Sequence, residues 1–404
     1  MNTNTLNSKD APFSTKGTST ATNSLIWMGA AISIAEIITG TYVAPLGLTK
    51  SLLAIFLGHL AGGTIMLLAG LIGAKERKTS METCALAFGS KGAIIFAVLN
   101  VLQLIGWTSI MIFDGAMMAS HIFPISQTYI AVLISALIVL WIWLGLHRIK
   151  WLSGVSAVAL FILSLFLFYK LYNMPLALTP STGEVTFGSA VELSAAMPLS
   201  WLPLISDYTK EAEKPVKATV ASVVSYNLVS IFMYVIGMGL AFAHQGADIG
   251  LAMKVLGLGA GGIFIAVLST VTTTFLDSYS AGVSSDFILG TNYVKRIATG
   301  VTGLGLVLAL TLPLEDITPF LYLISSVFAP MVAVLIASYF TLGQKTTEAV
   351  NYVNVISWIL GFALYRLTIN YEVGLGVTIN CIIATYIITL VANKCCQLVS
   401  HEKK

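Results

Sequence analysis

The stretch SLIWMGAAISIAEIITGTYVAPLGL, residues 24–48, decides the fold class of this chain. It is almost wholly apolar, and a helix that crosses a bilayer needs about 20 such residues. Its only charged side chain is Glu36, and it also contains Gly40 and Pro45. Glycine, proline and hydroxyl residues tolerate an interrupted helix, and interrupted backbone at membrane depth has to line a cavity or be buried in protein. We therefore predict a broken membrane helix that carries a carboxylate at mid-depth.

Apolar runs of the same kind recur along the whole chain. Of its 404 residues, 57% are hydrophobic and 10% are charged, whereas a soluble domain has about 25% charged residues. This composition excludes a soluble enzyme, a disordered protein and a nucleic-acid-binding protein, and it favours an all-α polytopic membrane protein in a lipid bilayer. The runs predict twelve transmembrane helices at 24–48, 51–73, 92–120, 127–146, 151–172, 187–206, 219–243, 259–289, 297–313, 319–341, 349–369 and 375–393.

The distribution of Lys and Arg predicts the orientation of these spans. With a cytoplasmic N-terminus, most of the 21 Lys and Arg residues fall on the cytoplasmic side. Both termini are then cytoplasmic, in an integral protein of the plasma (cytoplasmic) membrane. Residues 1–23 and 394–404 are predicted to be cytoplasmic tails, the first of them disordered. Cys395 and Cys396, in the second tail, are either lipidation sites or ordinary thiols.

The spans divide into two halves of similar length and opposite orientation. Spans one to five cover 24–172, spans six to ten cover 187–341, and spans eleven and twelve cover 349–393. An odd number of spans per half inverts the second half, which is the pattern of inverted-repeat transporters. The second half begins with a span that contains AMPLSWLP at 196–203, so this helix is also predicted to be broken.

Glu36 is the strongest functional candidate within a span. An ionisable residue in the membrane costs at least a few kcal/mol, which makes it a functional candidate by default. The Glu36 carboxylate, with Ser33 nearby, would accept hydrogen bonds from an amino group or ring N–H of a substrate. In its protonated form it would carry a coupling proton instead. The structural alternative is a side chain that caps the broken backbone.

The span at 259–289 carries a stripe of hydroxyl groups. Thr270, Thr273, Thr274 and Asp277 are spaced i, i+3, i+4 and i+7, so they share one face of a helix. Such a stripe offers oxygen ligands to a hard cation or hydrogen bonds to a substrate. Hydrogen bonding between helices is the structural alternative.

Aromatic and amide side chains complete the candidate site. Gln103 and Trp107 share a face of the span at 92–120 and suit the polar edge and the flat face of a heterocycle. Trp201, in the second predicted break, would supply another ring face. Asp114 lies nearer the outer end of its span and is either a functional residue or a solvated one. His59 lies in a GxxxG segment, which is typical of helix packing. No HExxH, GxSxG or GxxxxGK[ST] motif supports an enzyme or an ATP-driven pump.

The sequence resembles the nucleobase–cation symporter-1 family of cytosine, purine and hydantoin permeases. The resemblance rests on residues 25–48, 103–107, 206–208 and 266–270 and covers essentially the whole chain. Within the family, the sequence is most similar to the hydroxymethylpyrimidine permease branch, which is associated with salvage of thiamine precursors. The resemblance implies twelve spans, the five-plus-five inverted-repeat (LeuT-like) fold with helices 1 and 6 broken, and sodium-coupled symport.

The resemblance also implies a sodium site between spans one and eight. Its ligands would be the backbone carbonyls of Gly29, Ile32 and Ala266 and the hydroxyls of Ser269 and Thr270. The Ala-x-x-Ser-Thr pattern at 266–270 is the most specific match to the family.

The implied nucleobase site comprises Trp107, Gln103 and the second broken segment around Pro198 and Ser200. This sequence departs from the family at Pro198, where an aromatic residue is usual, and at Glu36, where cytosine permeases carry a small hydroxyl residue. An aminopyrimidine whose exocyclic amine donates to Glu36 suits these changes better than cytosine does.

From these observations we expect a secondary transporter that imports a pyrimidine, with hydroxymethylpyrimidine as its substrate and sodium as its coupling ion. No cofactor and no nucleic-acid partner is expected, and the sequence does not determine the oligomeric state. A proton-coupled cytosine or purine permease remains an alternative. A membrane sensor or enzyme is disfavoured, because neither an output domain nor a catalytic constellation is present.

Overall fold

The computed structural model describes residues 17–122, 124–173, 185–244, 259–371, 374 and 376–402. Within these residues the chain is helical, apart from a single parallel β-bridge between Thr18 and Ala212. The helices are α1 (Thr20–Ala31), α2 (Ile34–Val43), η1 (Ala44–Leu46), α3 (Leu48–Glu76), α4 (Ser80–Phe88), α5 (Gly92–Ile122), α6 (Gln127–Tyr172), α7 (Phe187–Ser200), α8 (Ile205–Thr209), α9 (Pro215–His244), α11 (Gly259–Leu289), α12 (Val294–Thr311), α13 (Thr318–Ile336), η2 (Ala337–Thr341), α14 (Tyr352–Thr368) and α15 (Val377–Glu402).

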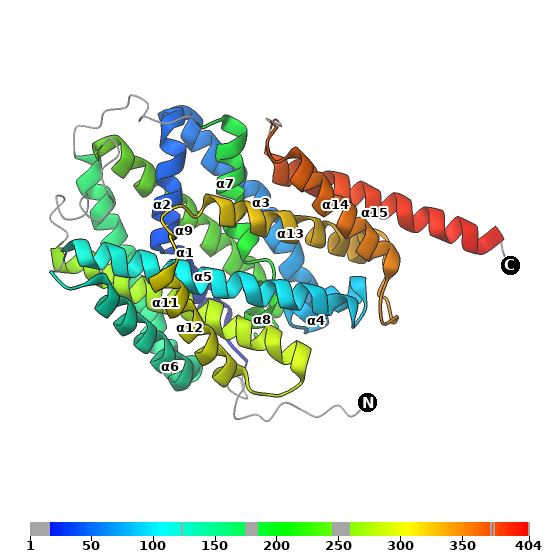
Figure 1. Cartoon of the computed structure of the whole chain (residues 1–404), viewed down its shortest axis with the longest axis horizontal. Helices are drawn as coiled ribbons and strands as arrows, with labels where there is room; N and C mark the ends of the chain where they lie inside the picture. Colours follow the sequence, from blue (N-terminus) through cyan, green and yellow to red (C-terminus); the bar gives the residue numbers. More distant parts are fainter. Residues whose placement is uncertain are drawn as a thin grey trace.

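The helices form two packed groups with a peripheral pair (Figure 1). In the first group, α1 and α2 pack against α9, and α3 packs against both α7 and α9. In the second group, α5 packs against α11 and α12, and α6 packs against α11 and α12 as well. Helices α14 and α15 pack against each other and against α13 at one side of the molecule. The broken helices therefore belong to one group and the hydroxyl-rich α11 to the other.

The first predicted break is confirmed and lies at Ile32 and Ser33. Helix α1 ends at Ala31 and α2 begins at Ile34, with a bend of 55° between them. Ser33 has an extended backbone, and its hydroxyl accepts a hydrogen bond from the Glu36 N–H at 3.2 Å. The break is short, because this cap restarts the helix at once. Glu36 consequently lies in the first turn of α2 and not in the interrupted segment itself.

The second predicted break follows α7. The helix ends at Ser200, turns through Trp201–Leu204 and resumes as the short α8. Pro198 lies in its last turn and has no N–H to donate to the preceding turn. The Trp201 N–H instead donates to the Pro198 carbonyl at 3.3 Å, which tightens and closes the helix. Both broken helices of the predicted fold are thus present.

Several described helices can cross a bilayer. Eight helical segments, two of them within α6, are long and apolar enough, and the bent α1–α2 pair raises this to nine. The remaining predicted spans correspond to the interrupted α7–α8 segment, to α11 and to α14, which has 17 residues. The spans predicted at 127–146 and 151–172 lie in a single helix, α6, so the predicted loop between them is helical. Long apolar helices establish an integral membrane protein.

Both ends of the chain are more ordered than predicted where the structure describes them. Helix α1 begins at Thr20, and the Glu213 N–H donates to the Thr18 carbonyl at 3.0 Å. Residues 17–23 of the predicted tail therefore belong to the packed structure, and residues 1–16 lie outside the described residues. Helix α15 continues to Glu402 through most of the predicted tail 394–404. Cys395 and Cys396 are exposed on this helix, and their lipidation stays a prediction.

A glycine contact sets the distance between α2 and α9. A Cβ atom built on Gly40 would lie 2.8 Å from the Tyr234 Cα and would overlap the Tyr234 carbonyl oxygen. A Cβ on Gly237 would lie 3.1 Å from the Gly40 Cα. Since α2 carries Glu36, the close approach places Glu36 within reach of side chains on α9.

We predict that Gly40→Ala destabilises the protein by about 1–3 kcal/mol, because the added methyl group forces two backbones apart. Thermal unfolding of the purified variant measures this effect. Gly300→Ala on α12 is the matched control, because a Cβ there meets nothing within 4 Å. The control should be neutral or slightly stabilising, since alanine is the better helix former. Equal melting temperatures for both variants would contradict the proposed close packing.

Candidate substrate and cation site

A small cavity lies between the two broken helices and the helices α5, α9 and α11. Its free volume is about 20 Å³, close to the space of one water molecule, so a substrate ring enters only when lining side chains move apart. Seven of the ten predicted substrate residues line it. The lining residues are Ala30, Ser33, Ala35, Glu36, Trp107, Met111, Met197, Ser200, Trp201, Tyr226, Thr273 and Asp277.

Glu36 is buried and held by two hydroxyl groups from α9. The Tyr226 hydroxyl lies 2.6 Å from Glu36 Oε1, to which it donates, and the Ser230 hydroxyl lies 2.7 Å from Oε2. Only 1% of the Glu36 surface is exposed. A buried carboxylate is stable only with such partners. The alternative interpretation as a backbone cap is not needed, because Ser33 already caps α2.

Aromatic rings form much of the remaining wall. Trp107 lines the cavity and packs in a T-shaped arrangement against Phe320, with ring centroids 5.4 Å apart. Its indole N–H is buried without a hydrogen-bond partner. Trp201 packs edge-to-face against Trp27 at 5.2 Å and against Tyr226 at 6.0 Å. Trp107 is therefore less enclosed by other rings than Trp201 is.

Three of the predicted substrate residues do not line the cavity. The Gln103 amide donates to the Asn100 side chain at 2.8 Å and to the Ser200 carbonyl at 3.4 Å. It therefore binds the backbone at the end of α7, where the second break begins. Pro198 faces α3, where its ring lies against Gly62. Thr274 is buried on α11 with its hydroxyl unpartnered. A helix face is wider than the cavity, so residues that share a face with a cavity residue can lie outside the cavity.

The residues predicted to bind sodium lie on two helices in contact, α1 and α11. Gly29 is in the last turns of α1, and its carbonyl accepts the Ile32 N–H at 3.2 Å, which leaves a second lone pair. On α11, the hydroxyls of Ser269 and Thr270 are buried without hydrogen-bond partners. Ala266 lies in the same helix, one turn earlier. Buried hydroxyls that lack partners fit a site for a hard cation, which binds oxygen ligands.

Sequence reasoning missed the α9 contribution to the site. Tyr226 and Ser230 are one helical turn apart and both contact Glu36. Behind them, His59 Nε2 lies 2.6 Å from the Ser230 hydroxyl, so His59 is more than a packing residue. A Tyr-x-x-x-Ser spacing in an apolar span was the available signal. Asp114, for which solvation was an alternative, is instead buried, with Oδ2 unpartnered.

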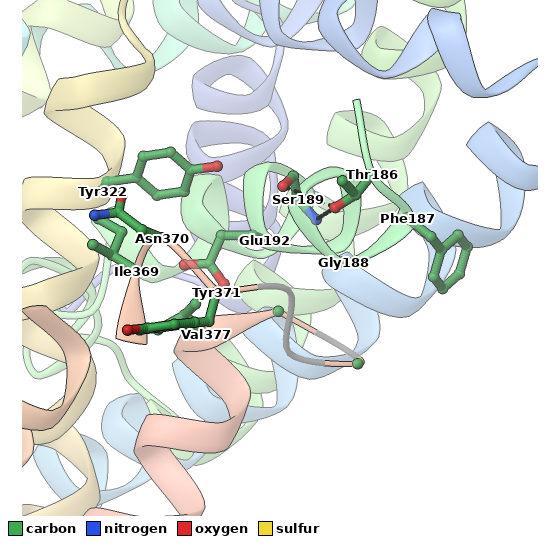
Figure 2. Close-up of a pocket in the computed structure, with 12 residues that line it drawn as sticks. Thr186, Phe187, Gly188, Ser189, Glu192, Tyr322, Ile369, Asn370, Tyr371 and Val377 are labelled. Carbon is green, nitrogen blue, oxygen red and sulfur yellow. Dashed lines mark hydrogen bonds between the residues drawn. The ribbon is translucent and has the colours of Figure 1, made fainter. Parts of the chain in front are cut away.

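A larger pocket of about 430 Å³ lies elsewhere, between the start of α7, α13 and the α14–α15 connection (Figure 2). Glu192 lies within it, but its carboxylate is occupied by neighbours. Tyr365 donates to Oε1 at 2.6 Å, the Thr378 N–H donates to Oε2 at 2.8 Å, and the Thr378 hydroxyl also donates to Oε1. These bonds join α15 and α14 to α7. Glu192 is thus a structural carboxylate, in contrast to Glu36.

Comparison with known proteins places these features in a family context. A search of curated protein sequences finds no match. The structure is similar to Mhp1, described as a nucleobase-cation-symport-1 family transporter in a closed conformation with bromovinylhydantoin bound, with a TM-score of 0.81, 15% identity and coverage of 98% of this chain and 95% of that chain.

Two further solved structures are similar. The inward-facing conformation of Mhp1 has a TM-score of 0.71 and 17% identity, covering 95% of this chain and 93% of that chain. The substrate-bound outward-open state of a Na⁺-coupled sialic acid symporter also has a TM-score of 0.71, with 14% identity, covering 95% and 91%. These likenesses confirm the inverted-repeat transporter fold. The sequence itself matches, over residues 12–388, the family described as permeases for cytosine/purines, uracil, thiamine and allantoin. The chain therefore belongs to this nucleobase–cation symporter-1 family of transporters.

Proposed function

We propose that this protein imports a pyrimidine, with hydroxymethylpyrimidine as its preferred substrate, and that the import is coupled to sodium. It would act in the plasma membrane with both termini in the cytoplasm and serve salvage of a thiamine precursor. Membership of a permease family establishes secondary transport of a nucleobase-like molecule. The choice of substrate and ion is our inference from the site.

The observation that carries the choice of substrate is a small cavity with a carboxylate and a tryptophan on its wall. Glu36 would accept the exocyclic amine of an aminopyrimidine, and Trp107 offers a flat face to the ring. Thr273 and Asp277 on α11 provide further polar groups.

The observation that supports sodium is that the buried hydroxyls of Ser269 and Thr270 lack hydrogen-bond partners on α11, a helix that contacts α1. A cation held by Ser269, Thr270 and the carbonyls of Gly29, Ile32 and Ala266 would join the two packed helix groups. In this proposal, sodium stabilises the arrangement of the broken helix in which Glu36 meets the substrate. One helix group then rocks against the other. Titrating sodium and substrate together should show that each increases the affinity for the other.

Uptake of labelled hydroxymethylpyrimidine into proteoliposomes, with and without an inward sodium gradient, tests the proposal. We expect sodium-dependent uptake that excess unlabelled cytosine inhibits weakly. Transport of cytosine or a purine instead would retain the family assignment and refute the proposed substrate. Equal uptake with choline in place of sodium at fixed pH would refute sodium coupling. That last result would favour a proton-coupled cytosine or purine permease, an alternative supported by the acidic Glu36 and Asp277 on the cavity wall.

Thr270→Ala should raise the sodium concentration for half-maximal uptake about tenfold or more, because loss of a ligand worth at least about 1.4 kcal/mol has that effect. Thr272→Ala is the matched control on the same helix. The Thr272 hydroxyl donates to the carbonyls of Leu268 and Ser269 and is not among the proposed ligands. A sodium dependence that is unchanged in Thr270→Ala would remove this residue from the cation site.

A further inference from the structure

A chain of hydrogen bonds extends from the cavity into α3. Ser230 lies between the two ends of this chain, with its hydroxyl 2.7 Å from Glu36 Oε2 and 2.6 Å from His59 Nε2. At the far end, His59 Nδ1 lies 2.8 Å from the Ile55 carbonyl oxygen. Glu36 and His59 are both about 1% exposed. The cavity carboxylate is therefore connected to a buried imidazole through one hydroxyl group.

Counting hydrogens shows that this chain needs one proton more than an ionised Glu36 and a neutral His59 provide. The Ile55 carbonyl can only accept, so His59 Nδ1 carries a hydrogen. A neutral imidazole then has a bare Nε2, which is also an acceptor. Ser230 has one hydroxyl hydrogen and cannot donate to both Oε2 and Nε2. Both short contacts become hydrogen bonds only when an additional proton is present, either on Glu36 or on His59.

The surroundings favour the neutral arrangement when the cavity holds no substrate. In that arrangement Glu36 is protonated and donates to Ser230, and Ser230 donates to His59. The titratable groups facing the chain are Tyr226, which donates to Glu36 Oε1, and Tyr234, whose ring packs edge-on against His59 at 4.8 Å. Asp277 lies on the cavity wall opposite, and the wall contains no Lys or Arg. An ionised Glu36 and a positively charged His59 are costly in this buried site until the substrate brings an N–H that donates to Glu36.

We propose that Glu36, Ser230 and His59 together hold one proton, and that substrate binding moves it from Glu36 through Ser230 to His59. We call these three residues the proton store. This inference rests on the proposed function, because it requires a substrate that donates an N–H to Glu36. When that N–H approaches, the O–H bond of Glu36 breaks and its proton passes to Ser230. Ser230 gives its own hydrogen to His59 Nε2. Glu36 becomes an ionised acceptor for the substrate, His59 becomes imidazolium, and no proton is exchanged with water.

This store makes substrate binding independent of pH near neutrality. A variant without a proton acceptor at position 59 must release the Glu36 proton to solvent instead. Its substrate affinity should then rise about tenfold per pH unit while Glu36 is protonated in the empty site. His59→Gln is the appropriate change, because its amide reaches the same hydroxyl and cannot take up a proton. Tyr234→Phe is the matched control, since it keeps the ring against His59 and removes a hydroxyl that donates to the Leu193 carbonyl and not to His59.

Titration calorimetry with hydroxymethylpyrimidine, in buffers of different ionisation enthalpy, counts the protons exchanged on binding. With the full-length protein in nanodiscs, we expect no net exchange for the wild type and for Tyr234→Phe. We expect release of up to one proton for His59→Gln. The same proton count in the wild type and His59→Gln would overturn the proposal, as would proton release by the wild type.

Infrared difference spectroscopy provides a test that needs no substrate. The empty wild-type protein should show a carbonyl band of a protonated carboxyl group that disappears in Glu36→Gln. The band should shift in Ser230→Ala, because its hydrogen-bond acceptor is removed. Absence of a band assignable to Glu36 would overturn the proposal. If hydroxymethylpyrimidine binds to none of the variants, the proposed substrate fails, and the infrared result still decides whether Glu36 holds the proton.

Discussion

Glu36→Gln should reduce the affinity for an aminopyrimidine about 10-fold to 100-fold and reduce uptake accordingly. A hydrogen bond to a charged group contributes about 1.5–3 kcal/mol, and the amide replaces it with a neutral acceptor. The amide also places an NH₂ group where a carboxylate oxygen accepts from Tyr226 or Ser230. Binding of labelled substrate to the purified protein, followed by uptake in proteoliposomes, measures both effects.

Glu192→Gln is the control for this substitution. Glu192 is also buried and accepts from a tyrosine and a threonine hydroxyl, but it lies outside the cavity. We expect this variant to melt at a lower temperature and to keep its substrate affinity. Unchanged affinity in Glu36→Gln, or an equal loss in both variants, would exclude a direct role for Glu36 in substrate binding.

Trp107→Ala should weaken substrate binding by about 1–3 kcal/mol, which corresponds to a 5-fold to 150-fold higher Kd. Stacking of a base on an aromatic side chain contributes this amount in other proteins, and Trp107 packs against fewer aromatic rings than Trp201 or Tyr226 does. Trp107→Phe should recover part of the loss, because it restores a smaller ring. Equilibrium binding across a series of ring-substituted pyrimidines measures the effect.

Trp143→Ala is the control for loss of an indole ring. Trp143 is 53% exposed on α6, and its indole N–H donates to Thr299 at 3.1 Å, away from the cavity. Its removal should leave Kd unchanged. If Trp107→Ala binds substrate as well as Trp143→Ala does, the proposed stacking on Trp107 is wrong.

Local sequence was sufficient to predict both interrupted helices. Ser33 restarts the helix through its own side chain, and Pro198 lacks the N–H that a continuing helix requires. These effects depend on a residue and its nearest neighbours, so they are visible without a structure. The same holds for Glu36, because a single carboxylate in a long apolar run is conspicuous wherever the helix packs.

Local sequence was less informative about which residues of a helix face the cavity. Gln103 and Trp107 are one turn apart on α5, yet only Trp107 lines the cavity and Gln103 binds the Ser200 carbonyl. On α11, Thr273 lines the cavity and Thr274 does not. Helical spacing defines a face of about 100° or more, and the rotation of each helix within the bundle selects the residues that reach the ligand.

The sequence by itself determined that this protein is a membrane transporter with two broken helices and a buried carboxylate. The spans and the carboxylate within them follow from hydropathy, and the breaks follow from backbone chemistry within a few residues. Only the tertiary structure decided what the carboxylate contacts. Ser230 lies far along the chain from Glu36, and the close approach of α2 and α9 at Gly40 brings them together. His59 joins the same chain from a third helix. Such contacts depend on how helices pack, and no local pattern encodes a hydrogen bond between distant segments.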